Sequence, residues 1–191
     1  MELVAPPPFV DRLPLARRAE AIDEGNAELC RRLKHSYYVY IAFLIGLLYS
    51  TDYSTAHPLL FWSCASSITA ALLGRVALIR KRPEMCRHGS SRWIKLLGLT
   101  TVLLAGPIGM MLAHSLLAYG YAKWHFTIVL IWSTGIAAGS IVSFTPNYRL
   151  LTIHMLLVLP PAFFSSLWIG DSQAQTYAVA NLLLCGFILS H

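Results

Sequence analysis

The sequence predicts an all-α, polytopic membrane protein with six transmembrane helices, and three observations support this prediction. Hydrophobic residues make up 56% of the 191 residues and charged residues only 13%, about half of the roughly 25% that is usual in soluble domains. The apolar residues fall in runs of close to the roughly 20 residues that a helix needs to cross a bilayer. The runs are continuous rather than alternating, which favours helices over the strands of a β-barrel.

Residues 1–34 form a polar segment ahead of the first apolar run. The segment contains three consecutive prolines at positions 6–8 and lacks the apolar core of a secretory signal peptide. From about Leu15 its composition favours a helix, although Gly25 weakens it. We therefore expect a cytoplasmic, partly amphipathic helix that leads into a transmembrane domain over residues 35–191.

Six apolar runs in this domain are candidates for membrane spans. The runs cover residues 36–51, 58–79, 94–117, 124–144, 148–169 and 174–190. The first run is the shortest and has tyrosines at its start. Because the connecting segments are short, helices that follow one another in the sequence are expected to pack as antiparallel neighbours.

The positions of lysine and arginine predict that both termini are cytoplasmic. With the N-terminus inside, all fifteen Lys and Arg residues except Lys123 fall at the inner side, as the positive-inside rule requires. Arg75 lies one turn inside the second run, and we expect its side chain to extend toward the inner interface. Attraction to anionic lipid at this face accounts for the net charge of +6. We therefore expect membrane lipid as a partner and do not expect nucleic acid.

Small residues at four-residue spacing predict where helices approach closely, since helix association in lipid depends on close backbone contact. The fourth run contains Gly135, Gly139 and Ser143, and the third contains Ala105 and Gly109. We interpret both stripes as sites of packing within the bundle. Dimerisation through one of them is the alternative, and a homodimer is an expected assembly.

A set of polar and aromatic residues is expected near the outer ends of the helices. The polar members are Asp52, His57, His114, His125, Asp171 and Gln175, and the aromatic members are Trp62, Tyr119, Tyr121, Trp124 and Trp168. Three interpretations remain open: the rim of a pocket for a small hydrophobic ligand, a site for a transition metal or for external protons, or ordinary interfacial residues. No pair of the histidines has the helical spacing of a chelate, so neither a metal nor a cofactor is predicted.

The fifth run contains a histidine and two consecutive prolines. His154 lies about 9 Å along this helix from the cytoplasmic side, and we expect a neutral histidine that is hydrogen-bonded within the bundle. Pro160 and Pro161 remove two backbone donors and predict a kink. Pro107 predicts a second bend in the third run. These bends are either static or hinges that transmit a change from the outer pocket to the inner face.

Several classes of function are disfavoured by what the apolar runs do not contain. No Asp or Glu occurs inside them, whereas ion pumps and proton-coupled transporters usually carry ionisable groups at depth. The chain has no hydrolase, kinase or nucleotide-binding motif, so catalysis is not predicted. A small transporter or channel-like protein and a metal-dependent membrane enzyme remain as alternatives.

The order of these features resembles the N-terminal membrane modules of bacterial sensor histidine kinases and diguanylate cyclases. The resemblance lies in GIAAGSIVSFTPNYRLLTIHMLLVLPPAFFSSLW (Gly135–Trp168), with a small-residue helix, a short turn and a helix with prolines in mid-span. The segment YAVANLLLCGFILSH resembles their last helix. The resemblance implies a signal-transduction module of the bacterial inner membrane. It would pass a membrane or outer-face signal to a cytoplasmic output domain expected after residue 191.

Overall fold

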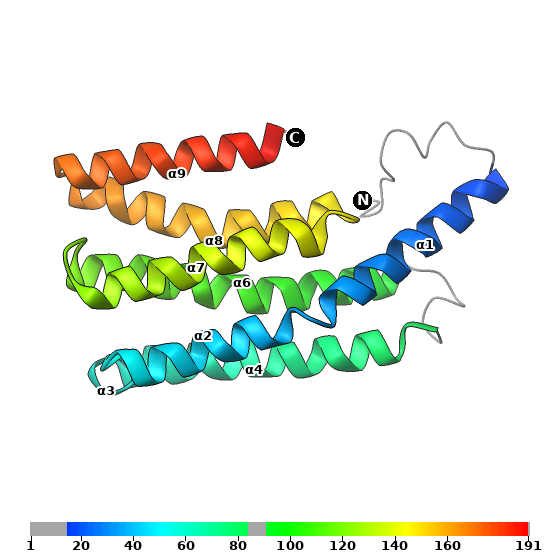
Figure 1. The fold of residues 1–191 in the computed structure, drawn as a ribbon, viewed down its shortest axis with the longest axis horizontal. Coiled ribbons are helices and arrows are strands. Elements are labelled where there is room, and N and C mark those ends of the chain that lie inside the picture. Colours follow the sequence, from blue (N-terminus) through cyan, green and yellow to red (C-terminus); the bar gives the residue numbers. More distant parts are fainter. Residues whose placement is uncertain (1–14, 84–90, 191) are drawn as a thin grey trace.

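The computed structural model describes residues 15–83 and 91–190, and every regular element within them is a helix. The elements are α1 (Leu15–Leu33), α2 (Tyr37–Ser50), α3 (Tyr53–Ala56), α4 (Pro58–Arg80), α6 (Ser91–Tyr119), α7 (Trp124–Phe144), α8 (Tyr148–Ile169) and α9 (Ser172–Ser190). The prediction of an all-α protein is confirmed. The long helices run side by side along an elongated bundle, and α1 continues beyond one end of it (Figure 1). The prolines at positions 6–8 lie outside the described residues.

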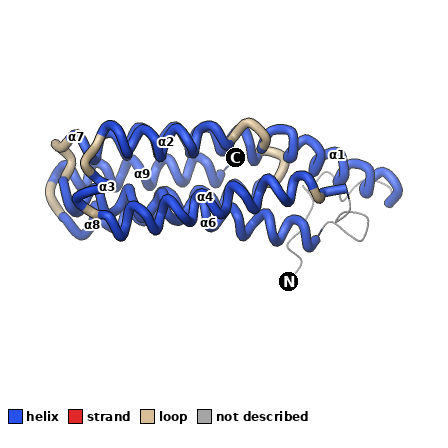
Figure 2. The backbone as a smooth tube through the Cα atoms, turned by 90° about the horizontal axis from the view of Figure 1, so that it is seen from below, coloured by secondary structure: helices blue, strands red, loops and turns tan. Residues whose placement is uncertain are grey.

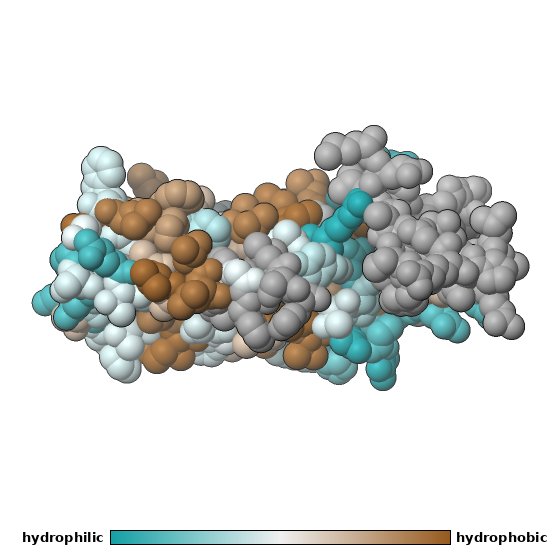
Figure 3. Space-filling model, turned by 90° about the horizontal axis from the view of Figure 1, so that it is seen from above, coloured by the Kyte–Doolittle hydropathy of each residue, from teal (hydrophilic) through white to brown (hydrophobic). Residues whose placement is uncertain are grey.

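Four of the helices are long and apolar enough to cross a membrane. They are α4, α7, α8 and residues 92–119 of α6, which confirms the prediction of a membrane protein with transmembrane helices. The other two predicted spans correspond to α2 and α9. With 14 residues, α2 extends only about 21 Å, less than the roughly 30 Å of a hydrocarbon core. On the face drawn in Figure 3, hydrophobic residues lie along the bundle and hydrophilic ones gather near its ends.

Local sequence signals explain where the helices begin and end. Pro58 occupies the first position of α4, where its missing N–H removes no helical hydrogen bond. The Asn147 side chain accepts a hydrogen bond from the backbone N–H of Leu150 and so caps the start of α8. Gly120 and Gly170 follow the ends of α6 and α8 with φ of 71° and 74°, a conformation that favours glycine.

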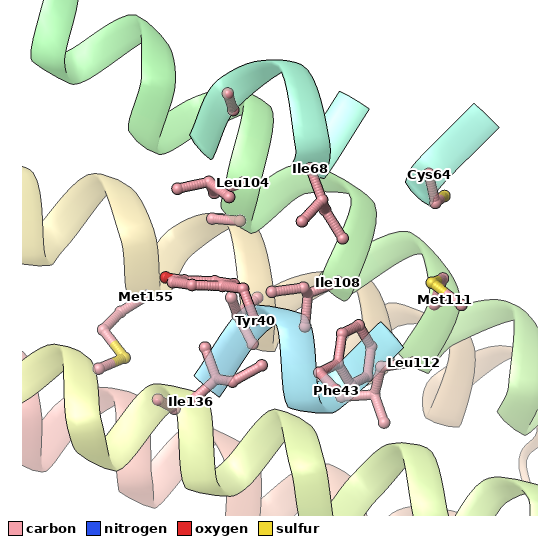
Figure 4. Packing of buried hydrophobic residues seen from close by; sticks show 14 of the residues in the cluster. Tyr40, Phe43, Cys64, Ile68, Leu104, Ile108, Met111, Leu112, Ile136 and Met155 are labelled. Atoms are coloured by element: carbon pink, nitrogen blue, oxygen red, sulfur yellow. The ribbon is translucent and has the colours of Figure 1, made fainter. Parts of the chain in front are cut away.

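The central helix of the bundle is α6, which packs against α8, α4 and α7. Figure 4 shows part of the resulting core, in which Ile108 and Leu112 of α6 meet Tyr40 and Phe43 of α2. In contrast, α9 packs on α8 at the edge of the bundle, and α1 contacts α7. The tube view in Figure 2 shows the same long, narrow bundle from below.

The small residues of α6 mark its closest approach to α8. Ala105 is fully buried, and a β-carbon on Gly109 would overlap the carbonyl oxygen of Leu157 and lie 3.2 Å from Cγ of Pro161. Pro161 has no N–H to donate to that carbonyl four residues earlier. Pro161 therefore leaves the Leu157 carbonyl without its helical hydrogen bond at the point where α6 comes closest. The absence of a side chain at Gly109 allows this close approach.

The small-residue stripe of α7 does not pack as predicted. Gly135 and Gly139 are exposed, and no atom lies within 4 Å of a β-carbon built on either. The packing face of α7 is instead made by the larger residues Ile136, Ser140 and Phe144, which lie about 100° around the helix from the glycines. The stripe predicted the wrong face because an apolar helix in lipid carries no amphipathic signal to orient it.

Candidate functional site

A cluster of aromatic and polar side chains closes one end of the bundle, next to the short helix α3. Its members, called here the outer-end cluster, are Asp52, Tyr53, His57, His114, Tyr119 and His125. They come from the α2–α4 connection, the last turns of α6 and the first turn of α7. The structure thus brings together five residues named from the sequence, namely Asp52, His57, His114, Tyr119 and His125.

One half of the cluster is organised around Tyr53. Its side chain is fully buried, and its hydroxyl lies 2.6 Å from Nδ1 of His114. Burial raises the pKa of Tyr53 well above its ordinary value, so the hydroxyl stays protonated while it shares a hydrogen bond with Nδ1. The His57 ring meets the His114 ring edge to face, with centroids 4.5 Å apart.

The other half pairs Tyr119 with His125. Their rings stack with centroids 4.3 Å apart and an interplanar angle of 9°. Nε2 of His125 lies 2.6 Å from Oδ1 of the largely exposed Asp52. Tyr119 also contacts the Tyr53 and His57 rings, so it joins the two halves.

Other residues predicted for this site lie apart from the cluster. Tyr121 packs with Phe126 and Tyr177 in a separate aromatic group. Trp62 and Trp168 are exposed by 58% and 87%, as expected of interfacial tryptophans. Trp124 donates a hydrogen bond from its indole to the Ser50 carbonyl at 3.2 Å, beside the cluster.

Tyr53 was not among the residues predicted for the site. Tyr53 and His57 are four residues apart, which places two side chains on the same face of a helix. This spacing could have indicated that they lie together if a helical turn had been predicted over residues 53–56. Metal binding finds no support in the geometry. Within the described residues, no three His, Cys, Asp or Glu side chains are arranged to hold a metal ion.

A second polar cluster lies at the opposite end of the bundle, and sequence reasoning missed it. This inner-end cluster consists of Tyr40, Arg75, Thr101, Ser140, Phe144 and His154. Arg75 is 0% exposed. Its Nη2 donates to Thr101 Oγ1 at 3.0 Å, and its guanidinium lies 5.5 Å from the centroid of the Phe144 ring, within cation–π range.

The prediction that Arg75 extends to the interface is therefore wrong. The side chain turns into the bundle because the hydroxyl of Thr101 and the ring of Phe144 offer it a hydrogen bond and an aromatic face. The spacing along α4 could have indicated this burial. The buried residues of α4 include Ile68, Ala71 and Leu72, and Arg75 continues their face of the helix at helical spacing.

His154 is hydrogen-bonded within the bundle, as predicted. Its Nε2 lies 2.8 Å from Oγ of Ser140, whose hydroxyl donates to the Ile136 carbonyl at 2.7 Å. Because the hydroxyl has only one proton and donates it to the Ile136 carbonyl, Nε2 of His154 is the donor to Oγ of Ser140. Nδ1 is buried and has no hydrogen-bond partner in the described part of the chain, which favours the neutral ring, since a second proton would find no acceptor there.

The three prolines singled out as hinges lie inside unbroken helices. Pro107 is within α6, and Pro160 and Pro161 are within α8. Pro161 contributes to the contact with Gly109 described above. That these prolines act as hinges stays a prediction.

Comparison of the chain with protein families, curated proteins and solved structures finds no family model, relative or solved structure that matches it.

Proposed function

We propose that this protein is a membrane-embedded sensory or regulatory module in which a change at the outer-end cluster is passed through α6 to the inner-end cluster. One observation supports this most strongly: α6 carries a residue of each cluster. His114 contacts Tyr53 at one end, and Thr101 binds Arg75 at the other. They are thirteen positions apart in the helix, about 20 Å along the axis.

The contact between α6 and α8 supports coupled movement of these two helices. A β-carbon at Gly109 has no room against the Leu157 carbonyl, so the two backbones touch and a shift of one is resisted by the other. His154 lies on α8 and binds Ser140 of α7. A displacement of α6 would therefore reach α4 through Arg75 and α7 through α8.

In this proposal the chain crosses the bacterial inner membrane six times with both termini in the cytoplasm. The distribution of lysine and arginine supports that orientation, which puts the outer-end cluster on the external side. The recipient of the signal is a cytoplasmic output domain or partner protein, and the module acts as a homodimer. No catalytic step is assigned to residues 1–191.

Distance measurements between spin labels test the coupling. The native cysteines are first replaced, and new cysteines are introduced at Lys81 and Thr145, which are both exposed at the inner end. Spin labels on these two cysteines report the separation of α4 and α7. We expect His114→Phe to shift or broaden this distance distribution in nanodiscs. Trp62→Phe is the matched control, because Trp62 is an exposed outer-end aromatic residue outside the cluster.

An unchanged distribution in a folded His114→Phe variant would contradict the coupling through α6. A shift of equal size in Trp62→Phe would show that any change in outer-end aromatic residues disturbs the bundle, and it would also count against a specific route.

A further inference from the structure

A cavity of about 360 Å³ lies beside Arg75, between the α1–α2 junction and α7. Its size is within the roughly 300–1,000 Å³ of ligand pockets. Arg75, Tyr40 and Ser140 form the buried part of its wall, whereas His35 and Val142 are exposed at its rim. It is separate from the outer-end cluster and shares no residue with it.

Two of the three guanidinium nitrogens of Arg75 lack a hydrogen-bond partner among the described residues. They are Nε and Nη1, and both are buried. An arginine remains charged even when buried, and a buried charge without a counter-ion is costly. No carboxylate is among the described residues that line the cavity. The site therefore lacks a negatively charged acceptor, and the planar guanidinium matches the two oxygens of an oxyanion.

The rest of the wall indicates an amphiphile rather than a small free ion. Leu33, Val39, Ile136 and Val142 provide an apolar surface, and the last three lie on helices that contribute to the membrane bundle. Val39 and Val142 are exposed by 41% and 65%, so the wall continues onto the lipid-facing side. The cavity is also close to the inner ends of α4 and α7, where lipid head groups lie in the proposed orientation.

A second charged residue favours an anionic head group over a zwitterionic one. Arg32 lines the cavity and donates from Nη1 to the Val142 carbonyl at 2.8 Å, which fixes it at the rim. It is also paired with Glu28, outside the cavity. A choline group would bring a further positive charge close to Arg32 and Arg75.

The missing side chain of Gly139 helps to keep the cavity open. Gly139 lines the cavity, and no atom lies within 4 Å of a β-carbon built on it. A β-carbon there would enter open space, and a larger side chain would take up part of the cavity. Gly139, which does not pack against another helix, thus leaves room for a ligand.

We propose that this cavity binds an anionic phospholipid, whose phosphate lies beside Arg32 and Arg75 while an acyl chain lies along the apolar wall. The lipid supplies the counter-charge that the described residues lining the cavity do not provide. Such binding does not depend on coupling through α6, because it is measured directly.

Native mass spectrometry of the full chain in a neutral detergent tests the proposal. Phosphatidylglycerol is titrated onto the wild type and onto Arg75→Met, Gly139→Leu and Gly135→Leu. We expect the apparent Kd to rise about tenfold or more in the first two variants, because each loses a charged contact or the space for the lipid. Gly135→Leu is the matched control on the same exposed stripe and is expected to bind as the wild type does.

Gly139→Leu keeps the test decisive should Arg75→Met fail to fold, since it fills open space and retains the charge. Phosphatidylcholine is expected to bind about tenfold more weakly than phosphatidylglycerol, given the repulsion of its choline. Equal binding of phosphatidylglycerol by the wild type and a folded Gly139→Leu variant overturns the proposal. So does displacement of the lipid by equimolar oleate or inorganic phosphate, which would identify a fatty acid or a free anion as the ligand.

Discussion

Arg75 donates a hydrogen bond from Nη2 to the hydroxyl of Thr101 over 3.0 Å, and this contact joins α4 to α6 where both residues are completely buried. An arginine in this position must find acceptors inside the bundle, because its side chain is shielded from bulk water. Thr101 supplies one acceptor. Arg75 also lines the cavity proposed to bind lipid.

The first prediction concerns the contribution of this hydrogen bond to stability. Thr101→Val removes the acceptor and should lower the free energy of unfolding by about 1.5–3 kcal/mol, the usual contribution of a hydrogen bond to a charged group. Reversible unfolding in mixed micelles measures the change. Thr100→Val is the control, because Thr100 is also buried and also bonds the Leu97 carbonyl but has no bond to Arg75. Equal losses in both variants would argue against a specific role of the Arg75 contact.

A second prediction concerns the approach of α6 to α8. Gly109→Ala places a methyl group against the Leu157 carbonyl and Pro161, so the helices must separate. We expect a loss of about 1–3 kcal/mol in the free energy of unfolding. Gly106→Ala should be neutral or stabilise by up to about 1 kcal/mol, because nothing lies within 4 Å of its β-carbon. A stable Gly109→Ala variant would refute the close contact.

The third prediction concerns the hydrogen bond of His154. Ser140→Ala leaves Nε2 of the buried histidine without a partner and should cost about 1–3 kcal/mol. The matched control is Ser133→Ala on the same helix, where the buried hydroxyl has no hydrogen-bond partner. That substitution should be neutral or slightly stabilising. A chemical shift of His154 Nε2 that is the same in Ser140→Ala and in the wild type would contradict the bond.

The fourth prediction concerns the pH dependence of α1. Hydrogen bonds from Arg31 and Arg32 lower the pKa of Glu28 from 4.5 to about 2. Because this folded-state pKa is depressed, the stabilisation is complete above about pH 4.5 and is lost as the pH falls through 2. Carbon-13 NMR of the Glu28 carboxyl should show a midpoint near 2 in the wild type. Replacement of both arginines by Gln should move the midpoint toward 4.5, and a wild-type midpoint near 4.5 would exclude the pairing.

Much of the fold was predictable because it depends on local sequence. The predicted runs 124–144 and 148–169 coincide with α7 and α8, since apolar length and the Asn147 cap are properties of neighbouring residues. The outer-end cluster was predictable in part, because polar residues at helix ends must lie near one membrane face. Its pairings, such as Tyr53 with His114, join segments 61 residues apart and follow from no local pattern.

By itself, the sequence determined that this chain is helical, that it belongs in a membrane and where its long helices lie. Only the tertiary structure decided which side of each helix faces its neighbours. The physical reason is that lipid and protein core are equally apolar, so a transmembrane helix need not separate a polar from an apolar face. For the same reason Arg75 was expected at the interface and lies instead inside the bundle, and Gly139 of α7 borders a cavity instead of a helix.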